Sequence, residues 1–136
     1  MSITKVKAVG NFGEDFTAKF LKKNKYKILD RNYSCKYGEI DIIACNKQYI
    51  LFVEVKTRGE NYIFTPSEAV TKSKQMKILK TAVYYLNHND INLQPRFDVC
   101  EVFVSPNKKP EINYIENAFM QEGDYASFWF ALRHII

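Results

Sequence analysis

The sequence has few of the residues that constrain small specialised folds. Its 136 residues include three cysteines, four prolines and five glycines. The cysteines stand at positions 35, 45 and 100 and show no Cys-x-x-Cys spacing, which argues against a zinc site or a thiol-redox motif. An odd, dispersed set of cysteines predicts a reducing, cytoplasmic location rather than a disulfide scaffold.

Long apolar runs are also missing. No stretch of about 20 apolar residues occurs, so no membrane span is expected. The first ten residues lack the apolar segment of a signal peptide. We find no internal repeat, low-complexity tract or linker, and therefore expect one domain over residues 1–136.

The residues that are present describe a basic globular protein. Hydrophobic residues make up 46% of the chain and aromatic residues 15%, which is typical of a packed core. Twenty Lys and Arg against fifteen Asp and Glu give a net charge of +5. Such a charge favours an acidic partner, nucleic acid first, although solubility alone explains it equally well.

Apolar spacing predicts two main helices. The first is expected over residues 8–24, with Val9, Phe12, Phe16 and Phe20 as its inner stripe. The second is expected to begin with a capping box at Thr65-Pro66-Ser67-Glu68 and to run to about Leu86. Its expected buried stripe is Met76, Leu79, Ala82, Val83 and Leu86.

Five segments rich in β-branched and aromatic residues predict strands. They cover residues 26–35, 39–45, 49–57, 96–104 and 112–115. The second and third are joined by the short turn Asn46-Lys47-Gln48, which is hairpin spacing. The predicted order is αβββαββ, and a helical crossover after a three-strand meander implies a mixed α/β sheet flanked by helices.

The C-terminal residues 120–136 carry a separate helical pattern. Tyr125, Phe128, Trp129 and Leu132 repeat at helical spacing after Gly123-Asp124. We expect a C-terminal helix there, which either packs on the core or forms the contact of a homodimer.

Acidic residues interrupt the two strands of the predicted hairpin. Asp41 lies between two isoleucines, and Glu54 lies between two valines with Lys56 two residues on. Side chains alternate along a strand, so the hairpin can bring Asp41, Glu54 and Lys56 to one face. Two carboxylates about 5 Å apart repel by roughly 3 kcal/mol at an effective dielectric of 20. With Glu14 of the first helix as a further candidate, this surplus of negative charge invites a divalent cation.

The ligand type in this cluster indicates the metal and its chemistry. Its ligands are all oxygens, and both histidines, His88 and His134, lie elsewhere in the sequence. Oxygen-only sites suit Mg²⁺ or Mn²⁺. Such an ion activates water and neutralises phosphate charge, as phosphodiester hydrolysis requires. Lys56 can orient that water or stabilise the developing negative charge.

The spacing of Asp41 and Glu54-Val55-Lys56 resembles the PD-(D/E)XK nuclease signature, with Ile40 where that signature has proline. The wider pattern resembles the YraN-like family of predicted bacterial endonucleases, which are similar in fold to archaeal Holliday junction resolvases. The matching positions span about residues 8–119: Gly13-Glu14 with Ala18 and Leu21, Asn32, Gly38-Glu39-Ile40-Asp41, Phe52-Val53-Glu54-Val55-Lys56-Thr57-Arg58, Ala69-Val70-Thr71 with Lys74-Gln75, Arg96-Phe97-Asp98-Val99, and Asn117-Ala118-Phe119.

The resemblance implies a restriction-endonuclease-like αβββαβ core and DNA, including branched DNA, as substrate. It implies Asp41, Glu54 and Glu14 as metal ligands and Lys56 as the catalytic lysine. Glu39, Arg58, Lys74 and Gln75 are the accessory or DNA-binding candidates.

Plainer interpretations remain for most of these residues. Glu54 and Lys56 also fit an exposed cross-strand pair, and Lys74 and Arg58 also fit solvated positions. Asp98 is expected to be a buried structural partner of Arg96 rather than a catalytic group. At the level of the whole protein, the alternatives are a nuclease-like domain that binds DNA without cutting it, or an interaction subunit that uses its aromatic tail.

Overall fold

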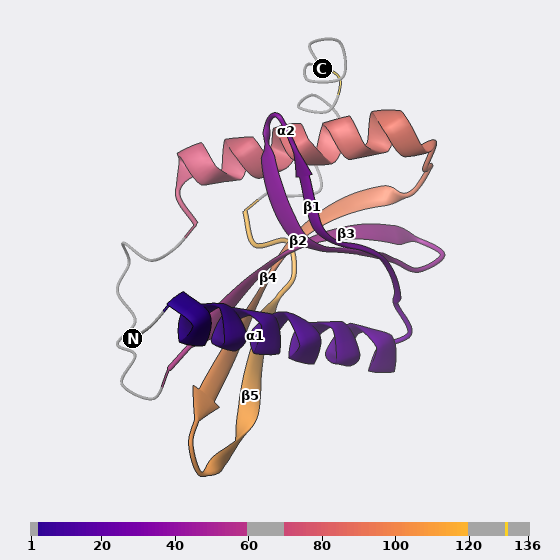
Figure 1. The fold of residues 1–136 in the computed structure, drawn as a ribbon. Coiled ribbons are helices and arrows are strands. Elements are labelled where there is room, and N and C mark those ends of the chain that lie inside the picture. Colours follow the sequence, from indigo (N-terminus) through magenta and orange to yellow (C-terminus); the bar gives the residue numbers. More distant parts are fainter. Residues whose placement is uncertain (1–2, 60–69, 120–129, 131–136) are drawn as a thin grey trace.

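A five-stranded sheet with one helix on each face forms the core of the protein (Figure 1). The computed structural model describes residues 3–59 and 70–119, together with Phe130. Its elements are α1 (Ile3–Lys23), β1 (Lys27–Cys35), β2 (Gly38–Cys45), β3 (Tyr49–Arg58), α2 (Lys72–Asn89), β4 (Gln94–Ser105) and β5 (Lys108–Ile115).

The strands lie in the sheet in the order in which they occur in the sequence. The neighbours β1–β2, β2–β3 and β4–β5 are antiparallel, whereas β3 and β4 are parallel. A parallel pair needs a crossover connection, and α2 lies within it. The predicted αβββαββ order and mixed sheet are therefore confirmed.

Each helix covers its own half of the core. The α2 face is formed by Ile43, Ile50, Phe52, Phe97 and the buried residues of α2. The α1 face is formed by Ile42, Ala44, Leu51, Val53, Cys100, Val102, Ala18 and Leu21. Glu54 and Lys56 follow Phe52 at even spacing along β3, so strand alternation directs them to the α2 face.

The predicted inner stripe of α1 is confirmed only in part, since Phe16 and Phe20 are half-buried and pack against the core. Phe12 is 42% exposed, and the buried positions of the helix are instead Thr17, Ala18 and Leu21. Gly13 explains the difference, because a Cβ at this position would lie only 1.9 Å from the Thr57 Oγ1. Thr17, Ala18 and Leu21 therefore reach the core, while Phe16 and Phe20 pack against it from partly buried positions.

Helix α2 also differs from its prediction. It begins at Lys72 with Thr71 as an extended N-cap, and it ends at Asn89, beyond the predicted Leu86. The capping box proposed at Thr65 lies outside the described residues. Met76 is 38% exposed and does not belong to the buried stripe. The stripe contains Leu79, Ala82, Val83 and Leu86 as predicted, with Ile78, Thr81 and Tyr85 in addition.

The end of the sheet is longer than its sequence pattern suggested. Strand β5 begins at Lys108 rather than residue 112, because only a tight turn separates it from the end of β4 at Ser105. The predicted C-terminal helix lies outside the described residues, apart from Phe130. Neither α1 nor α2 combines the length and the apolar character that a membrane span needs.

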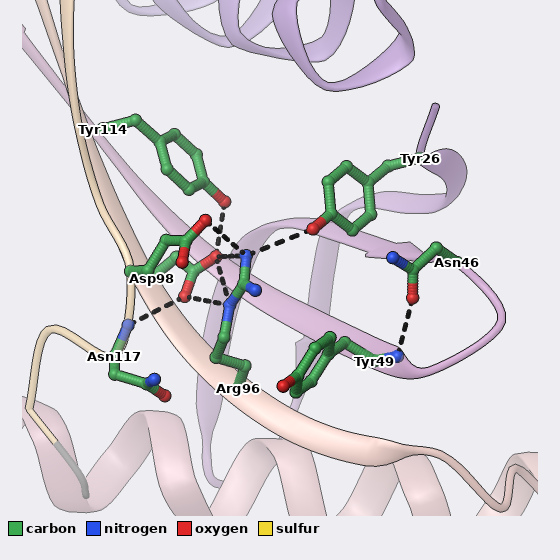
Figure 2. Close-up of polar contacts among 8 residues, drawn as sticks. Tyr26, Asn46, Tyr49, Arg96, Asp98, Tyr114 and Asn117 are labelled. Carbon is green, nitrogen blue, oxygen red and sulfur yellow. Dashed lines mark hydrogen bonds and ion pairs between the residues drawn. The ribbon is translucent and has the colours of Figure 1, made fainter. Parts of the chain in front are cut away.

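A buried ionic network connects β4 to its surroundings on the α1 face (Figure 2). Arg96 donates to Asp98 through Nε (3.0 Å to Oδ1) and Nη2 (2.9 Å to Oδ2). Tyr114 of β5 donates its hydroxyl to the same Oδ2 at 2.6 Å, and the Asn117 backbone N–H donates to Oδ1 at 3.1 Å. Asp98 is fully buried, so these donors replace its hydration. The predicted structural role of Asp98 beside Arg96 is confirmed.

Candidate metal and nucleic-acid site

The β2–β3 ladder stops at the residues of interest. The last paired residues are Ile42 and Val53, and Asp41 and Glu54 lie one residue further along each strand. In place of a further ladder bond, the Asp41 Oδ2 accepts the backbone N–H of Val55 at 2.8 Å. The Asp41 carboxylate is thereby attached to the backbone of β3, beside Glu54.

The neighbouring β1–β2 ladder keeps its register beside Asp41. It pairs Arg31 with Ile42 and Tyr33 with Ile40, and it passes over Asn32 and Asp41. Asn32 adopts a left-handed conformation with φ of 53°. Asparagine tolerates this conformation better than most residues. The β1–β2 register itself is unchanged across this gap, so within the described residues Asp41 lies in the sheet without a ladder partner on either neighbouring strand.

A groove of about 510 Å³ opens between this part of the sheet and the first turns of α2. On the sheet side it is lined by the three acids Glu39, Asp41 and Glu54. On the helix side it is lined by hydroxyl and ammonium groups, those of Thr71, Ser73, Lys74 and Lys77. One wall thus suits a cation and the opposite wall suits an anion.

Asp41 carries the clearest electrostatic signature of the site. Burial, followed by the charges of Glu54 and Glu14, raises the pKa of Asp41 to about 7, against the Val55 hydrogen bond and Lys74, which lower it. A carboxyl with such a pKa is close to half protonated at neutral pH in the metal-free protein. Its proton is available for displacement by a cation.

Lys56 lies on the same face of β3, two residues beyond Glu54. Burial lowers the pKa of the Lys56 ammonium, and the nearby charge of Lys74 lowers it further, whereas Glu54 raises it. The parallel register pairs Lys56 with Glu101 of β4. The lysine is therefore embedded among charged groups rather than fully solvated.

Glu14, on α1, acts on the site through its negative charge. Its charge contributes to the raised pKa of Asp41. The Glu14 side chain is 14% exposed, and within the described part of the chain its Oε2 has no hydrogen-bond partner and one long ion pair, of 3.7 Å, with Arg31. Arg31 lies closer to Asp15, at 2.7 Å. A buried carboxylate oxygen with so weak a partner is suited to a further cation.

The four accessory candidates divide into two groups. Glu39 and Lys74 line the groove, and the Lys74 Nζ lies 2.5 Å from the Glu54 Oε1. Gln75 is instead part of the helix start, where its side-chain amide donates to the Val70 carbonyl at 2.9 Å. Arg58 lies 3.9 Å from the buried Glu101 and is not part of the groove lining.

Sequence reasoning missed two contributors to this region. Glu101 is 8% exposed and accepts a hydrogen bond from Asn113 at 2.9 Å. Its signal was available, since it is an acid inside the apolar run from Phe97 to Val104. Lys77 lines the groove one turn after Lys74, and only the docking of α2 reveals its position.

The side chains present fit a hard divalent cation with two protein ligands. Within residues 3–59 and 70–119, no three Asp, Glu, His or Cys side chains form a group able to hold a metal ion. Mg²⁺, however, is commonly held by one or two carboxylates, with waters and substrate phosphates completing its coordination. Asp41 and Glu54 meet that requirement, and in this conformation Glu14 acts on them through its charge.

Comparisons with known proteins agree on one family. Residues 13–102 match the family described as "Uncharacterised protein family UPF0102". A UPF0102 protein of Caldanaerobacter subterraneus subsp. tengcongensis is 50% identical over 116 residues, which cover 83% of this chain and 95% of that protein. A UPF0102 protein of Clostridium perfringens is 48% identical over 115 residues, with 83% and 94% covered. The matched range includes Glu14, Asp41, Glu54 and Lys56, and the descriptions name no activity.

Proposed function

The chain belongs to the uncharacterised protein family UPF0102, and we propose that it is a metal-dependent endonuclease that hydrolyses DNA phosphodiester bonds. One observation carries this proposal. Asp41 and Glu54 lie side by side on the sheet, with Lys56 on the same face, along a groove whose opposite wall is basic.

Each of these side chains has a role in the proposed reaction. Asp41 and Glu54 would hold a Mg²⁺ or Mn²⁺ ion, and Glu14 would add negative charge that strengthens its binding. A metal at this position supplies an activated water and neutralises charge on the phosphate. Lys56 would orient the attacking water and stabilise the charge that develops on the phosphate oxygens.

The substrate class follows from the charge of the groove and of the chain. Lys74 and Lys77 line the helix side of the groove, and the whole chain carries a net charge of +5. A polyanion with one phosphate at the carboxylates would place neighbouring phosphates within reach of these lysines. DNA with a branch or junction is the substrate that the family resemblance favours.

The test is a cleavage assay with linear, nicked and four-way-junction DNA in Mg²⁺ or Mn²⁺. Glu54→Gln is expected to abolish cleavage, and Lys56→Met is expected to slow it by roughly 10²–10³-fold. Glu111→Gln is the matched control, because Glu111 is exposed on β5 and distant in sequence from the site. Cleavage by Glu54→Gln at the wild-type rate, or the absence of cleavage on every substrate, would contradict the proposal.

A second function is favoured by the Lys74–Glu54 ion pair. This pair already neutralises one of the two carboxylates, as expected of a nuclease-like domain that binds DNA without cutting it. Binding that weakens steeply with salt, without any metal-dependent turnover, would establish this alternative.

A further inference from the structure

The Lys74–Glu54 ion pair spans the groove between two elements that are distant in sequence. The Lys74 Nζ lies 2.5 Å from the Glu54 Oε1. The Glu54 side chain is 12% exposed, whereas the Lys74 side chain is 49% exposed. The backbone of Lys74 is held by the helix cap, since its N–H donates to the Thr71 Oγ1 at 3.2 Å. The backbone of Lys74 is thus fixed, whereas about half of its side chain is exposed to solvent.

The charge of Lys74 acts on the whole acidic wall. It opposes the rise in the pKa of Asp41 and lowers the pKa of Lys56. The single ammonium of Lys74 is paired with Glu54, attracts the Asp41 carboxylate and repels the Lys56 ammonium. A divalent cation at the carboxylates would supply the same compensation with twice the charge and at a shorter distance, about 2.0–2.1 Å for Mg²⁺.

We propose that Lys74 is an exchangeable counter-ion: it neutralises Glu54 in the metal-free protein, leaves Glu54 when a divalent cation binds there, and then contacts a phosphate of the nucleic acid in the same groove. The proposal rests on the function proposed above and assigns the substrate-phosphate contact to the first turn of α2. A lysine makes this exchange readily, because its ammonium is a single charge on a flexible four-carbon stem.

The helix wall is suited to receive the phosphate. Ser73 and Lys77 line the groove together with Lys74. All three lie within the first two turns of α2, whose N-terminal end favours anions. Once Lys74 leaves Glu54, its ammonium can therefore contact a phosphate that is bound at the helix wall of the same groove.

The exchange has two thermodynamic consequences. A cation that must be displaced weakens metal binding, so removal of Lys74 should strengthen it. Lys74 is free to contact phosphate only when the metal has replaced it, so its contribution to DNA binding should depend on the metal. By linkage, metal and DNA then strengthen each other's binding by the same factor.

The first experiment measures Mn²⁺ affinity by isothermal titration calorimetry without nucleic acid. Lys74→Gln is expected to bind Mn²⁺ about 3- to 10-fold more tightly than the wild type, the range of one partly exposed ion pair plus its local repulsion. Lys77→Gln, the matched control on the same wall, is expected to stay within about twofold. An unchanged or weaker affinity of Lys74→Gln would overturn the exchange and leave the proposed function intact. Absence of Mn²⁺ binding in the wild type and in both variants would overturn both.

The second experiment measures binding of a fluorescein-labelled four-way DNA junction by anisotropy. All proteins carry Lys56→Met, which suppresses cleavage, and each is titrated with and without Mn²⁺. Addition of Lys74→Gln is expected to weaken binding about fivefold with Mn²⁺ and by less than about twofold without it. Equal weakening under both conditions would show that Lys74 is an ordinary phosphate contact and would overturn the exchange.

Discussion

Two carboxylates on opposite faces of the same sheet, the buried Asp98 and the partly buried Asp41, have very different surroundings. Asp98, on the α1 face, receives hydrogen bonds from Arg96, Tyr114 and the Asn117 backbone (Figure 2). Asp41, on the α2 face, receives one backbone hydrogen bond and lies beside a second acid, Glu54. The Asp98 carboxylate is fully hydrogen-bonded and paired with Arg96, whereas the charge of Asp41 is only weakly compensated by its surroundings. This difference separates a structural acid from one that is available for chemistry.

Breaking the buried Arg96–Asp98 pair should have the largest effect on stability. Arg96→Met leaves Asp98 buried without its cation, and loss of one partner of a buried pair typically costs about 3–5 kcal/mol. We expect the free energy of unfolding in urea to fall by that amount. Asp15→Asn is the control, because it breaks the exposed Arg31–Asp15 pair, and it should change stability by less than about 1 kcal/mol. Similar losses of unfolding free energy in the two variants would show that the Arg96–Asp98 pair is no more important for stability than an exposed pair.

The stability of the metal-free protein should also depend on pH through Asp41, and it should fall as the pH rises. Since the pKa of Asp41 is raised to about 7 in the folded protein, the folded state binds this proton more tightly than the unfolded chain. That stabilisation is fully present below pH of about 4 and is lost as the pH rises through about 7. The metal-free protein should therefore lose about 2–3 kcal/mol of stability between about pH 5 and pH 8 from this group.

Asp41→Asn provides the comparison for that measurement. The variant has no proton to lose, so this part of the pH dependence should disappear in urea unfolding curves recorded at the same two pH values. An identical pH dependence in the wild type and Asp41→Asn would show that the pKa of Asp41 is not raised in the folded protein.

Loss of a single hydrogen bond around Asp98 should have a smaller effect on stability. Tyr114→Phe removes a 2.6 Å hydrogen bond to Asp98 and should cost about 1.5–3 kcal/mol of unfolding free energy. Burial and the charge of Asp98 raise the pKa of the Tyr114 phenol, which keeps it a donor. The Tyr26 hydroxyl is 3.5 Å from the Arg96 Nη2, so Tyr26→Phe should cost less than about 1 kcal/mol. The reverse order of the two costs would be evidence against this network.

The parts of the site that depend on local sequence were predictable. Strand alternation and a short turn place Asp41 beside Glu54 whatever surrounds the hairpin, and the structure brings them together as expected. The pairing of Arg96 with Asp98 is equally local, since the two are separated by one residue.

The remaining features depend on how distant segments pack. The orientation of α1 is decided by the close approach of Gly13 to Thr57, which no apolar period reveals. The Lys74–Glu54 pair depends on the position of α2 after the crossover. Asn117 and Tyr114 reach Asp98 only because β5 returns beside β4. Periodicity predicts the elements, but it does not predict which surfaces meet.

The most direct test of the metal site is an anomalous diffraction experiment on crystals soaked in Mn²⁺. We expect a single strong anomalous peak between the carboxylates of Asp41 and Glu54, with the Lys74 ammonium withdrawn from Glu54. A map without a peak at these carboxylates at saturating Mn²⁺, with Lys74 still bound to Glu54, would contradict this expectation.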